Sequence, residues 1–244
     1  MRYTYRFAEK NIGISSIYED LHRLCTAYRI GDAPVDFEVE TAQDDIDLER
    51  EKSVRAAELE GDPGRTYRDG YLETLAVYRK IAERMPSYDT VLMHGSCIAV
   101  DGEGYIFIAK SGTGKSTHTR LWRELLGDRA VMINDDKPLI RVSENGATAY
   151  GTPWDGKHRL STNTSVPLKA VCILERAEEN SIVPVTVSEA YPMLVQQVYR
   201  PSSSEVMAQT LKLIDRLADR VSLWRLGCNM EPEAARISYE AMKG

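Results

Sequence analysis

The order of apolar and polar positions predicts short strands near the start of the chain and an amphipathic helix after them. Residues 2–7, 12–17 and 35–39 have the short, partly alternating pattern of strands, and residues 18–28 have that of a helix. Between residues 69 and 85 the apolar side chains recur at helical spacing, so we expect this helix to pack on another surface. Together these elements predict a small α+β N-terminal region.

A highly charged stretch lies within this region, over residues 43–60, where Asp, Glu, Arg and Lys outnumber the apolar side chains. This pattern is typical of an exposed helix or a mobile connector, and a docking arm for a partner is the alternative. Residues 61–64, Gly-Asp-Pro-Gly, then interrupt the chain, because glycine and proline favour turns over helices. The helix at residues 69–85 is therefore expected to be a separate element.

From residue 90 onward the pattern changes to a dense succession of strands. The stretch at residues 91–100, which is apolar except at His94-Gly95-Ser96, is followed by the turn sequence Asp-Gly-Glu-Gly and an apolar run at 105–109, which together predict a β-hairpin. Further strands are expected at residues 130–133, 138–142, 147–151, 168–174 and 221–226, and further helices at 188–198, 204–220 and 232–242. We therefore expect two domains, residues 1–89 and residues 90–244.

Composition and charge exclude several classes of protein. Of the 244 residues, 43% are hydrophobic and 28% are charged, as in ordinary globular proteins. No apolar run approaches the roughly 18 residues of a membrane span, and the first residues lack the apolar segment of a signal peptide. We therefore expect a cytoplasmic protein that does not bind membranes. The net charge of −6 argues against a nucleic-acid partner, because nucleic-acid binding depends on a basic surface.

The cysteines and histidines are too scattered to suggest a structural metal. The sequence has four of each, without C-x-x-C or H-E-x-x-H spacing. We expect reduced thiols and no structural metal held by the protein alone.

The strongest chemical signal follows the apolar run at residues 105–109. The sequence continues as Lys-Ser-Gly-Thr-Gly and then Lys-Ser-Thr, which opens an amphipathic helix. A strand that turns through glycines into a helix directs backbone N–H groups and the positive end of the helix dipole at one point, which suits a phosphate. Ala109 stands where the usual pattern has its first glycine. We expect the nucleotide to be bound by Ser111, Gly112, Thr113, Gly114, Lys115, Ser116 and Thr117.

The second signal is the pair Asp135-Asp136, directly after the predicted strand at residues 130–133. Carboxylates at the end of a strand shortly after a phosphate-binding helix are well placed to lie near the metal ion and the γ-phosphate. One of them can hold Mg²⁺ while the other accepts the proton of an attacking hydroxyl. The pair therefore predicts phosphoryl transfer.

Three segments occur in the same order and with similar spacing as in a known family: His94-Gly95, residues 111–116, and Asp135-Asp136. In these segments the sequence resembles the catalytic domain of HPr kinase/phosphorylase, whose relatives include the phosphoenolpyruvate carboxykinases. The resemblance covers roughly residues 90–230 and does not extend to residues 1–89. It implies an α/β fold with a mixed β-sheet around a P-loop.

The same resemblance implies a role for each matching residue. Asp135 is similar to the family's catalytic aspartate, which deprotonates a serine hydroxyl, and Asp136 is then left to serve the metal. His94 matches the active-site histidine, Lys115 the phosphate-binding lysine, and Ser116 a ligand of Mg²⁺. ATP and Mg²⁺ are the implied cofactors.

Two departures from the family bear on the acceptor. Thr117 stands where HPr kinases have a glutamate that helps to hold the metal, so this loop is closer to that of the carboxykinases. Residues 151–157, Gly-Thr-Pro-Trp-Asp-Gly-Lys, replace the segment with which HPr kinases contact their protein substrate. HPr itself is therefore not the expected acceptor, and a hydroxyl-bearing protein, peptide or small molecule takes its place.

We thus expect an ATP- and Mg²⁺-dependent kinase acting on a hydroxyl. The alternatives are an ATP-binding regulatory or partner-binding module without transfer activity, and a phosphorylase or hydrolase. The sequence leaves open whether the chain forms a homo-oligomer. It also leaves the roles of several residues open. Two roles are possible for Trp154, Lys157 and His158, which are lining the acceptor pocket and packing the loop. For Lys137 the alternatives are neutralising phosphate charge and pairing with Asp136. For Arg200 they are a transition-state arginine and a surface residue.

Overall fold

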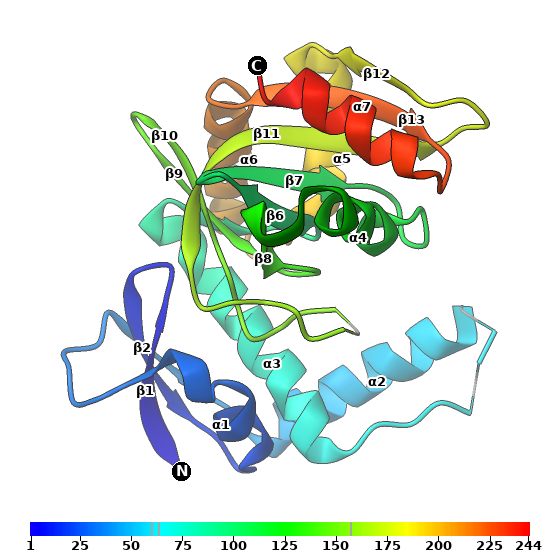
Figure 1. The fold of residues 1–244 in the computed structure, drawn as a ribbon. Helices are drawn as coiled ribbons and strands as arrows, with labels where there is room; N and C mark the ends of the chain where they lie inside the picture. The colour runs from blue at the N-terminus through cyan, green and yellow to red at the C-terminus, as the bar shows by residue number, and fades with distance from the viewer. Residues whose placement is uncertain (60, 63, 157) are drawn as a thin grey trace. The chain divides into compact units, whose positions relative to one another are not determined.

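The structure is a computed structural model that describes residues 1–59, 61–62, 64–156 and 158–244. The chain divides into two compact units, Met1–Arg84 and Met85–Gly244 (Figure 1). From the sequence, the boundary between the two domains is expected after residue 89, five residues later than the observed division. The 3₁₀ turn Met85–Tyr88 belongs instead to the second unit, where it packs on its first strand and on a later helix. Pro63 and Lys157 lie outside the described residues.

The first unit contains a small sheet with the strand order β3-β1-β2-β4. β1 pairs antiparallel with β2, and β2 pairs parallel with β4. The strands are β1 (Arg2–Phe7), β2 (Lys10–Ser15), β3 (Arg29–Ile30) and β4 (Phe37–Glu40). The helix expected at residues 18–28 is wrong in length, because α1 spans only Asp20–Leu24 and a 3₁₀ turn, Thr26–Tyr28, follows it. β3 was not predicted, since two residues are too short to show a period.

Two longer helices complete the first unit. The charged stretch forms α2 (Gln43–Leu59), and the amphipathic pattern forms α3 (Asp69–Arg84). The two helices pack against each other. Their contact includes an ion pair between Arg79 Nε and the buried Glu49 carboxylate, at 2.7 Å. Of the structures expected for the charged stretch, the helix is therefore the one that forms.

The second unit is built on a mixed sheet with the order β5-β9-β10-β11-β7-β6-β8, in which β13 also pairs with β11 and β12 with β13. β11 runs parallel to β7 and β13, whereas β6 and β7 form the predicted antiparallel hairpin. The strands are β5 (Thr90–Leu92), β6 (Ser96–Val100), β7 (Glu103–Ile108), β8 (Ala130–Asn134), β9 (Leu139–Ser143), β10 (Gly146–Tyr150), β11 (Ser165–Arg176), β12 (Ser181–Pro184) and β13 (Ser222–Cys228). The second unit is therefore a mixed α/β structure.

The strand expected at residues 91–100 is wrong as a continuous element. β5 ends at Leu92 and pairs with β9, whereas β6 begins at Ser96 and pairs with β7 and β8. Between them the His94 backbone N–H donates to the carbonyl of Gln197 at 2.7 Å, so the chain leaves the sheet at this point. A Cβ at Gly95 would lie 2.9 Å from the Ile106 side chain, and this close packing requires glycine.

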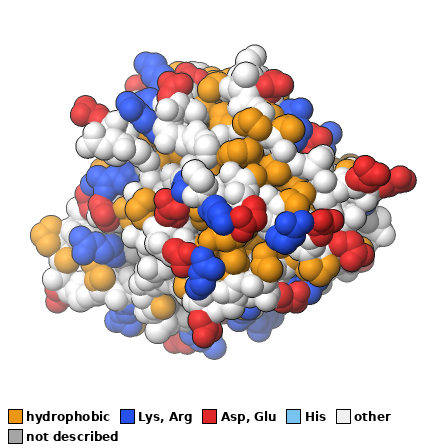
Figure 2. All heavy atoms as spheres, turned by 45° about the horizontal axis from the view of Figure 1, so that its top comes forward, with side chains coloured by type: hydrophobic (Ala, Val, Ile, Leu, Met, Phe, Trp, Pro, Cys, Tyr) orange, Lys and Arg blue, Asp and Glu red, His pale blue; other side chains and the backbone are white. Residues whose placement is uncertain are grey.

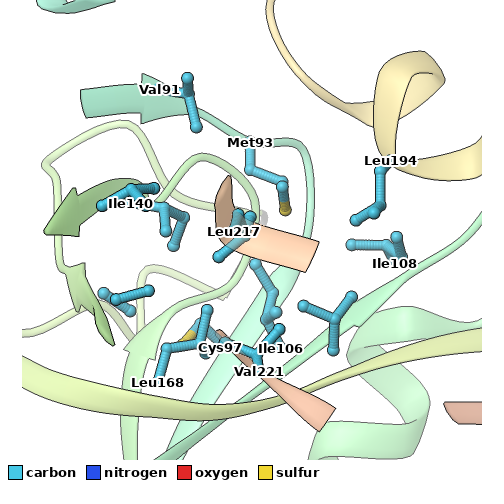
Figure 3. Packing of buried hydrophobic residues seen from close by; sticks show 14 of the residues in the cluster. Val91, Met93, Cys97, Ile106, Ile108, Ile140, Leu168, Leu194, Leu217 and Val221 are labelled. Atoms are coloured by element: carbon cyan, nitrogen blue, oxygen red, sulfur yellow. The ribbon is translucent and has the colours of Figure 1, made fainter. Parts of the chain in front are cut away.

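Helices cover both faces of this sheet (Figure 1). One apolar cluster joins the sheet to α5 (Val187–Gln197) and α6 (Ser204–Ala218). Figure 3 shows Ile106 and Ile108 of β7 in this cluster, together with Leu194 of α5 and Leu217 of α6. The second cluster, on the opposite face, joins the sheet to α4 (Lys115–Leu126) and α7 (Pro232–Met242), with Trp122 fully buried. β7 therefore contributes to both clusters and is held rigidly.

The distribution of charge on the surface and the lengths of the helices match the expectations for a globular protein that were drawn from the composition. On the face shown in Figure 2, acidic and basic side chains are interspersed rather than separated into large fields. Within the described residues, every helix is either too short or too polar to cross a bilayer.

Candidate functional site

The segment at residues 110–114, called the glycine loop below, lies between the carboxyl end of β7 and the first turn of α4 (Figure 1). Gly112 has a φ of +75° and Gly114 a φ of +122°, values that residues with a Cβ rarely adopt. Gly114 is the N-cap of α4, and its carbonyl accepts a hydrogen bond from the His118 N–H at 2.9 Å. The earlier N–H groups of such a helix have no partner within it, so they are free to bind an anion.

Lys115 is a buried cation without an ion pair. Its side chain is only 9% exposed, and its Nζ donates to the carbonyl of Ala109 at 3.2 Å. Among the described residues, no carboxylate lies within ion-pair distance of it. Burial lowers the pKa of this ammonium group, although the charges of Asp136 and Asp135 oppose the effect. A buried ammonium whose hydrogen-bond partner is a neutral carbonyl is a favourable place for an anion.

Arg176, at the end of β11, also contacts the loop. Its Nη2 donates to the carbonyl of Gly112 at 2.5 Å. β11 is the parallel neighbour of β7, so the carboxyl ends of both strands meet at the same edge of the sheet. Sequence reasoning missed this arginine, because Arg176 only ends an apolar run and nothing local marks it.

A pocket of about 440 Å³ adjoins the loop. It is bounded by Gly112 and Gly114, by the first turns of α4, and by the ends of β11 and β13, with Leu121 and Met230 among its apolar side chains. Its volume is in the usual range for a small-molecule site. The remaining expected binding residues sit on the loop and on the first turn of α4, where Ser111 is exposed and Thr113, Ser116 and Thr117 are partly exposed.

Asp135 is held by the hydroxyl of Ser96, which in turn contacts the hydroxyl of Thr119. Ser96 Oγ donates to Asp135 Oδ1 at 2.6 Å, and Ser96 Oγ lies 2.9 Å from Thr119 Oγ1 on α4. The carboxylate is 5% exposed. Within the described part of the chain, no hydrogen bond is made to its second oxygen, Oδ2. A Cβ at Gly156 would lie 2.8 Å from that oxygen, so the loop packs closely on Asp135 at a position where a larger side chain would clash.

Asp136 differs from its neighbour in that basic groups engage both of its oxygens. His94 Nε2 lies 3.2 Å from Oδ1, and Lys137 Nζ pairs with Oδ2. Burial raises the pKa of this carboxyl, but the hydrogen bond from His94 and the charge of Lys137 outweigh burial and lower the pKa to about 2. Of the two roles left open for Lys137, the structure therefore shows the pairing with Asp136.

Asn134, the last residue of β8, fixes the backbone that carries both aspartates. Its Oδ1 accepts from the backbone N–H of Asp136 at 2.8 Å and of Lys137 at 2.5 Å. Its Nδ2 donates to the carbonyl and the hydroxyl of Thr152, at 3.0 and 3.1 Å. Asn134 is fully buried, and sequence reasoning gave it no role. The available signal was a hydrogen-bonding amide at the end of an apolar run, directly before two acidic residues.

The loop after β10 lies next to this pair of aspartates. Thr152 Oγ1 donates to the carbonyl of Lys137 at 2.8 Å, and Gly156 adjoins Asp135. Trp154 is 7% exposed, which indicates packing within the loop, and His158 is exposed. Lys157 lies outside the described residues. Arg200, beyond α5, is exposed, and the described structure contains no ion pair for it.

Few groups are available to hold a metal ion. The described residues include no cluster of three or more His, Cys, Asp and Glu side chains that could bind one. Ser116 and Asp136 provide oxygen atoms, the ligand type that Mg²⁺ prefers, and Mg²⁺ commonly binds through one or two such groups plus phosphate oxygens and water. These two side chains are of the ligand type that suits Mg²⁺ bound together with a nucleotide.

Comparisons with known proteins give two similarities. Among solved structures, the HPr(Ser) kinase/phosphatase from Coxiella burnetii matches with 8% sequence identity and a TM-score of 0.36, over 63% of this chain and 99% of that one. No curated protein matches. The family described as SynChlorMet cassette protein ScmC matches residues 70–231, which is well over half of the chain. The chain therefore belongs to the ScmC family of SynChlorMet cassette proteins.

Proposed function

We propose that this chain is an ATP- and Mg²⁺-dependent phosphotransferase that moves the γ-phosphate to a hydroxyl group. The observation that carries the proposal is Lys115, a buried ammonium without an ion pair at the base of a glycine loop. A triphosphate would supply the missing anion, the N–H groups of the loop would bind its oxygens, and the adjoining pocket would take the nucleoside.

Asp135 is the group proposed to accept the proton of the acceptor hydroxyl. It has an oxygen without a hydrogen bond among the described residues, whereas both oxygens of Asp136 are paired with His94 and Lys137. A base needs a free lone pair within reach of the hydroxyl that it deprotonates. The sequence-based assignment of Asp135 as the base and Asp136 as the metal carboxylate is therefore kept.

Ser116 and Asp136 are the residues proposed to hold Mg²⁺. When bound, the ion would neutralise charge on the phosphates. His94 contacts Asp136 rather than Asp135, so it is proposed to orient the metal carboxylate. Lys115 would contact the outer phosphate oxygens as a point charge.

The proposed acceptor is a hydroxyl-bearing protein, peptide or small molecule. The loop after β10 brings Gly156 next to Asp135, so this loop is proposed to form a wall of the acceptor site. The alternatives are an ATP-binding module without transfer activity and a hydrolase that passes the phosphate to water. A general base with a free oxygen favours transfer over the first of these.

The test is a transfer assay with [γ-³²P]ATP, Mg²⁺, and panels of serine-containing peptides and hydroxyl metabolites. For the full chain we expect labelled product, and for Asp135→Asn a loss of about 10²- to 10⁴-fold, because that is the usual contribution of general-base catalysis. The matched control is Asp128→Asn, at an exposed position, which should keep full activity. Asp135→Asn with wild-type transfer would show that the base lies elsewhere. ATP binding without release or transfer of phosphate would favour the regulatory module.

A further inference from the structure

Three buried side chains from different parts of the second unit form a chain of hydrogen bonds. Thr119 lies on α4, Ser96 opens β6, and Asp135 follows β8. Their exposed fractions are 2%, 0% and 5%. The two contacts, at 2.9 Å and 2.6 Å, therefore lie in an environment where water does not compete for them.

The directions of these hydrogen bonds follow from the number of hydrogens available. An ionised carboxylate only accepts, so the single hydroxyl hydrogen of Ser96 points to Asp135 Oδ1. Ser96 Oγ is then an acceptor toward α4, and Thr119 must be the donor. Thr119 has only weaker alternatives for its hydrogen, the carbonyls of Lys115 and Ser116, both at 3.3 Å. The chain therefore runs in one direction, from Thr119 through Ser96 to the carboxylate.

This chain distinguishes the two oxygens of Asp135. Oδ1 is held by Ser96, whereas Oδ2 lies beside Gly156, where a Cβ would come within 2.8 Å of it. The carboxylate therefore has one oxygen fixed by a hydrogen bond and one oxygen that accepts none from the described residues. Thr119 also lies one helical turn after Lys115, on the helix that the glycine loop opens. The orientation of Asp135 is thus tied to the helix proposed to bind phosphate.

We propose that Ser96 and Thr119 are positioning residues that orient Asp135, so that Oδ2 is the oxygen that takes the proton. This inference rests on the proposed function. In the reaction, the acceptor oxygen bonds to the γ-phosphorus while its proton passes to Oδ2. The bond between the γ-phosphorus and the bridging oxygen breaks, and its electron pair leaves with ADP. Without the two hydroxyls, the carboxylate would rotate and Oδ2 would lose its alignment.

The test uses binding of a transition-state mimic, because it needs no acceptor. Isothermal titration calorimetry gives the affinity of the full chain for Mg·ADP alone and with aluminium fluoride, which mimics the transferring phosphoryl group with water in line. The variants are Ser96→Ala, Thr119→Val and Thr119→Ser, and the hydroxyl is kept only in the last. The matched control is Thr210→Val, because Thr210 is 1% exposed and its hydroxyl donates to the carbonyl four residues earlier in α6.

We expect every variant to bind Mg·ADP as the wild type does. The gain in affinity from aluminium fluoride should fall by about 10- to 100-fold in Ser96→Ala, which is the scale of misplaced catalytic groups. Thr119→Val should lose less, and Thr119→Ser and Thr210→Val should keep the full gain. Hydrolysis of Mg·ATP should follow the same order in kcat, with KM for ATP unchanged.

Two results would overturn the inference while leaving nucleotide binding intact. One is a full aluminium fluoride gain in Ser96→Ala and Thr119→Val, and the other is a wild-type protein that binds Mg·ADP without any such gain. If the wild type does not bind Mg·ADP, the proposed function fails and the inference fails with it. A urea denaturation curve for each variant shows whether the variant is folded. Misfolding would also weaken the binding of Mg·ADP, whereas a misaligned Asp135 would not.

Discussion

Asp135 and Asp136 are neighbours in the chain and yet lie in different surroundings. Asp135 faces the hydroxyl of Ser96 and a glycine, whereas Asp136 faces a histidine and a lysine. Hydroxyls orient a carboxylate without adding charge to it, but cations stabilise its ionised form directly. The difference supports the two separate roles proposed for them, which the sequence could only distribute by resemblance.

His22, in the first unit, is a residue whose titration should affect stability. Tyr5 Oη lies 2.6 Å from Nδ1 and Ser16 Oγ lies 2.8 Å from Nε2, so both ring nitrogens are engaged. Burial lowers the pKa of His22, and the N-terminal ammonium and Arg29 act in the same direction, whereas a hydrogen bond with the Met1 backbone and the charge of Glu73 oppose them without cancelling the shift. The folded state therefore binds the proton less tightly than the unfolded state does.

This difference in pKa predicts a loss of stability in acid. Above the unfolded-state pKa, about 6.5, both states carry a neutral His22 and the stability is at its full value. As the pH falls below that value the unfolded state takes up a proton first, so stability decreases. Urea denaturation at pH 7.5 and 5.0 measures this loss, which should be smaller in His22→Gln. An equal loss in the variant and the wild type would contradict the prediction, since the other histidines contribute to both.

At the scale of elements, the end of β8 and the loop after β10 form one hydrogen-bonded structure. Asn134 connects them, because its acceptor oxygen binds the backbone of Asp136 and Lys137 while its donor nitrogen binds Thr152. The loop is also anchored by Thr162, whose Oγ1 donates to the carbonyl of Met132 at 2.7 Å. The wall proposed for the acceptor site is therefore fixed to the strand that presents the aspartates.

Asn134→Asp tests this connection. The change keeps an oxygen for the backbone N–H groups of Asp136 and Lys137 but places a second oxygen against the carbonyl of Thr152. We expect a loss of about 1–3 kcal/mol in the free energy of unfolding, the cost of a buried polar group without its partner, and faster hydrogen exchange across residues 151–164. Asn145→Asp, in an exposed turn, is the matched control. Unchanged exchange in Asn134→Asp would show that the loop is held by other contacts.

Elements with a clear local period could be predicted from the sequence, and elements defined by distant partners could not. α3, α6 and the β6–β7 hairpin follow from helical spacing and from turn residues. The break between β5 and β6 was missed although His94-Gly95-Ser96 interrupts the apolar residues there, because a short polar interruption does not by itself end a strand and this one depends on a hydrogen bond to Gln197. β12 was also missed, since this short edge strand contains a proline and is largely exposed.

At the scale of the whole molecule, the residues of the candidate site also fall into those that a local sequence pattern could predict and those that depend on distant partners. The glycine loop is contiguous in sequence, so its residues could be named in advance. Ser96 and Arg176 become neighbours of Asp135 and of the loop only through the strand order of the sheet. Single residues of this kind carry no local pattern. The overall charge is no guide either, because a net charge of −6 coexists with one buried lysine at the loop.

The central claim is that Lys115 and the glycine loop bind the phosphates of ATP. Calorimetric titration of Mg·ATP into the wild type, Lys115→Ala and Lys169→Ala tests it most directly, because Lys169 lies on β11 and already pairs with Glu103 at 2.8 Å. The account predicts that Lys115→Ala weakens binding by roughly 100-fold, since truncating one partner of a buried charge contact costs about 2–5 kcal/mol. Lys169→Ala should bind as the wild type does. Equal ATP affinity for the wild type and Lys115→Ala would contradict the account.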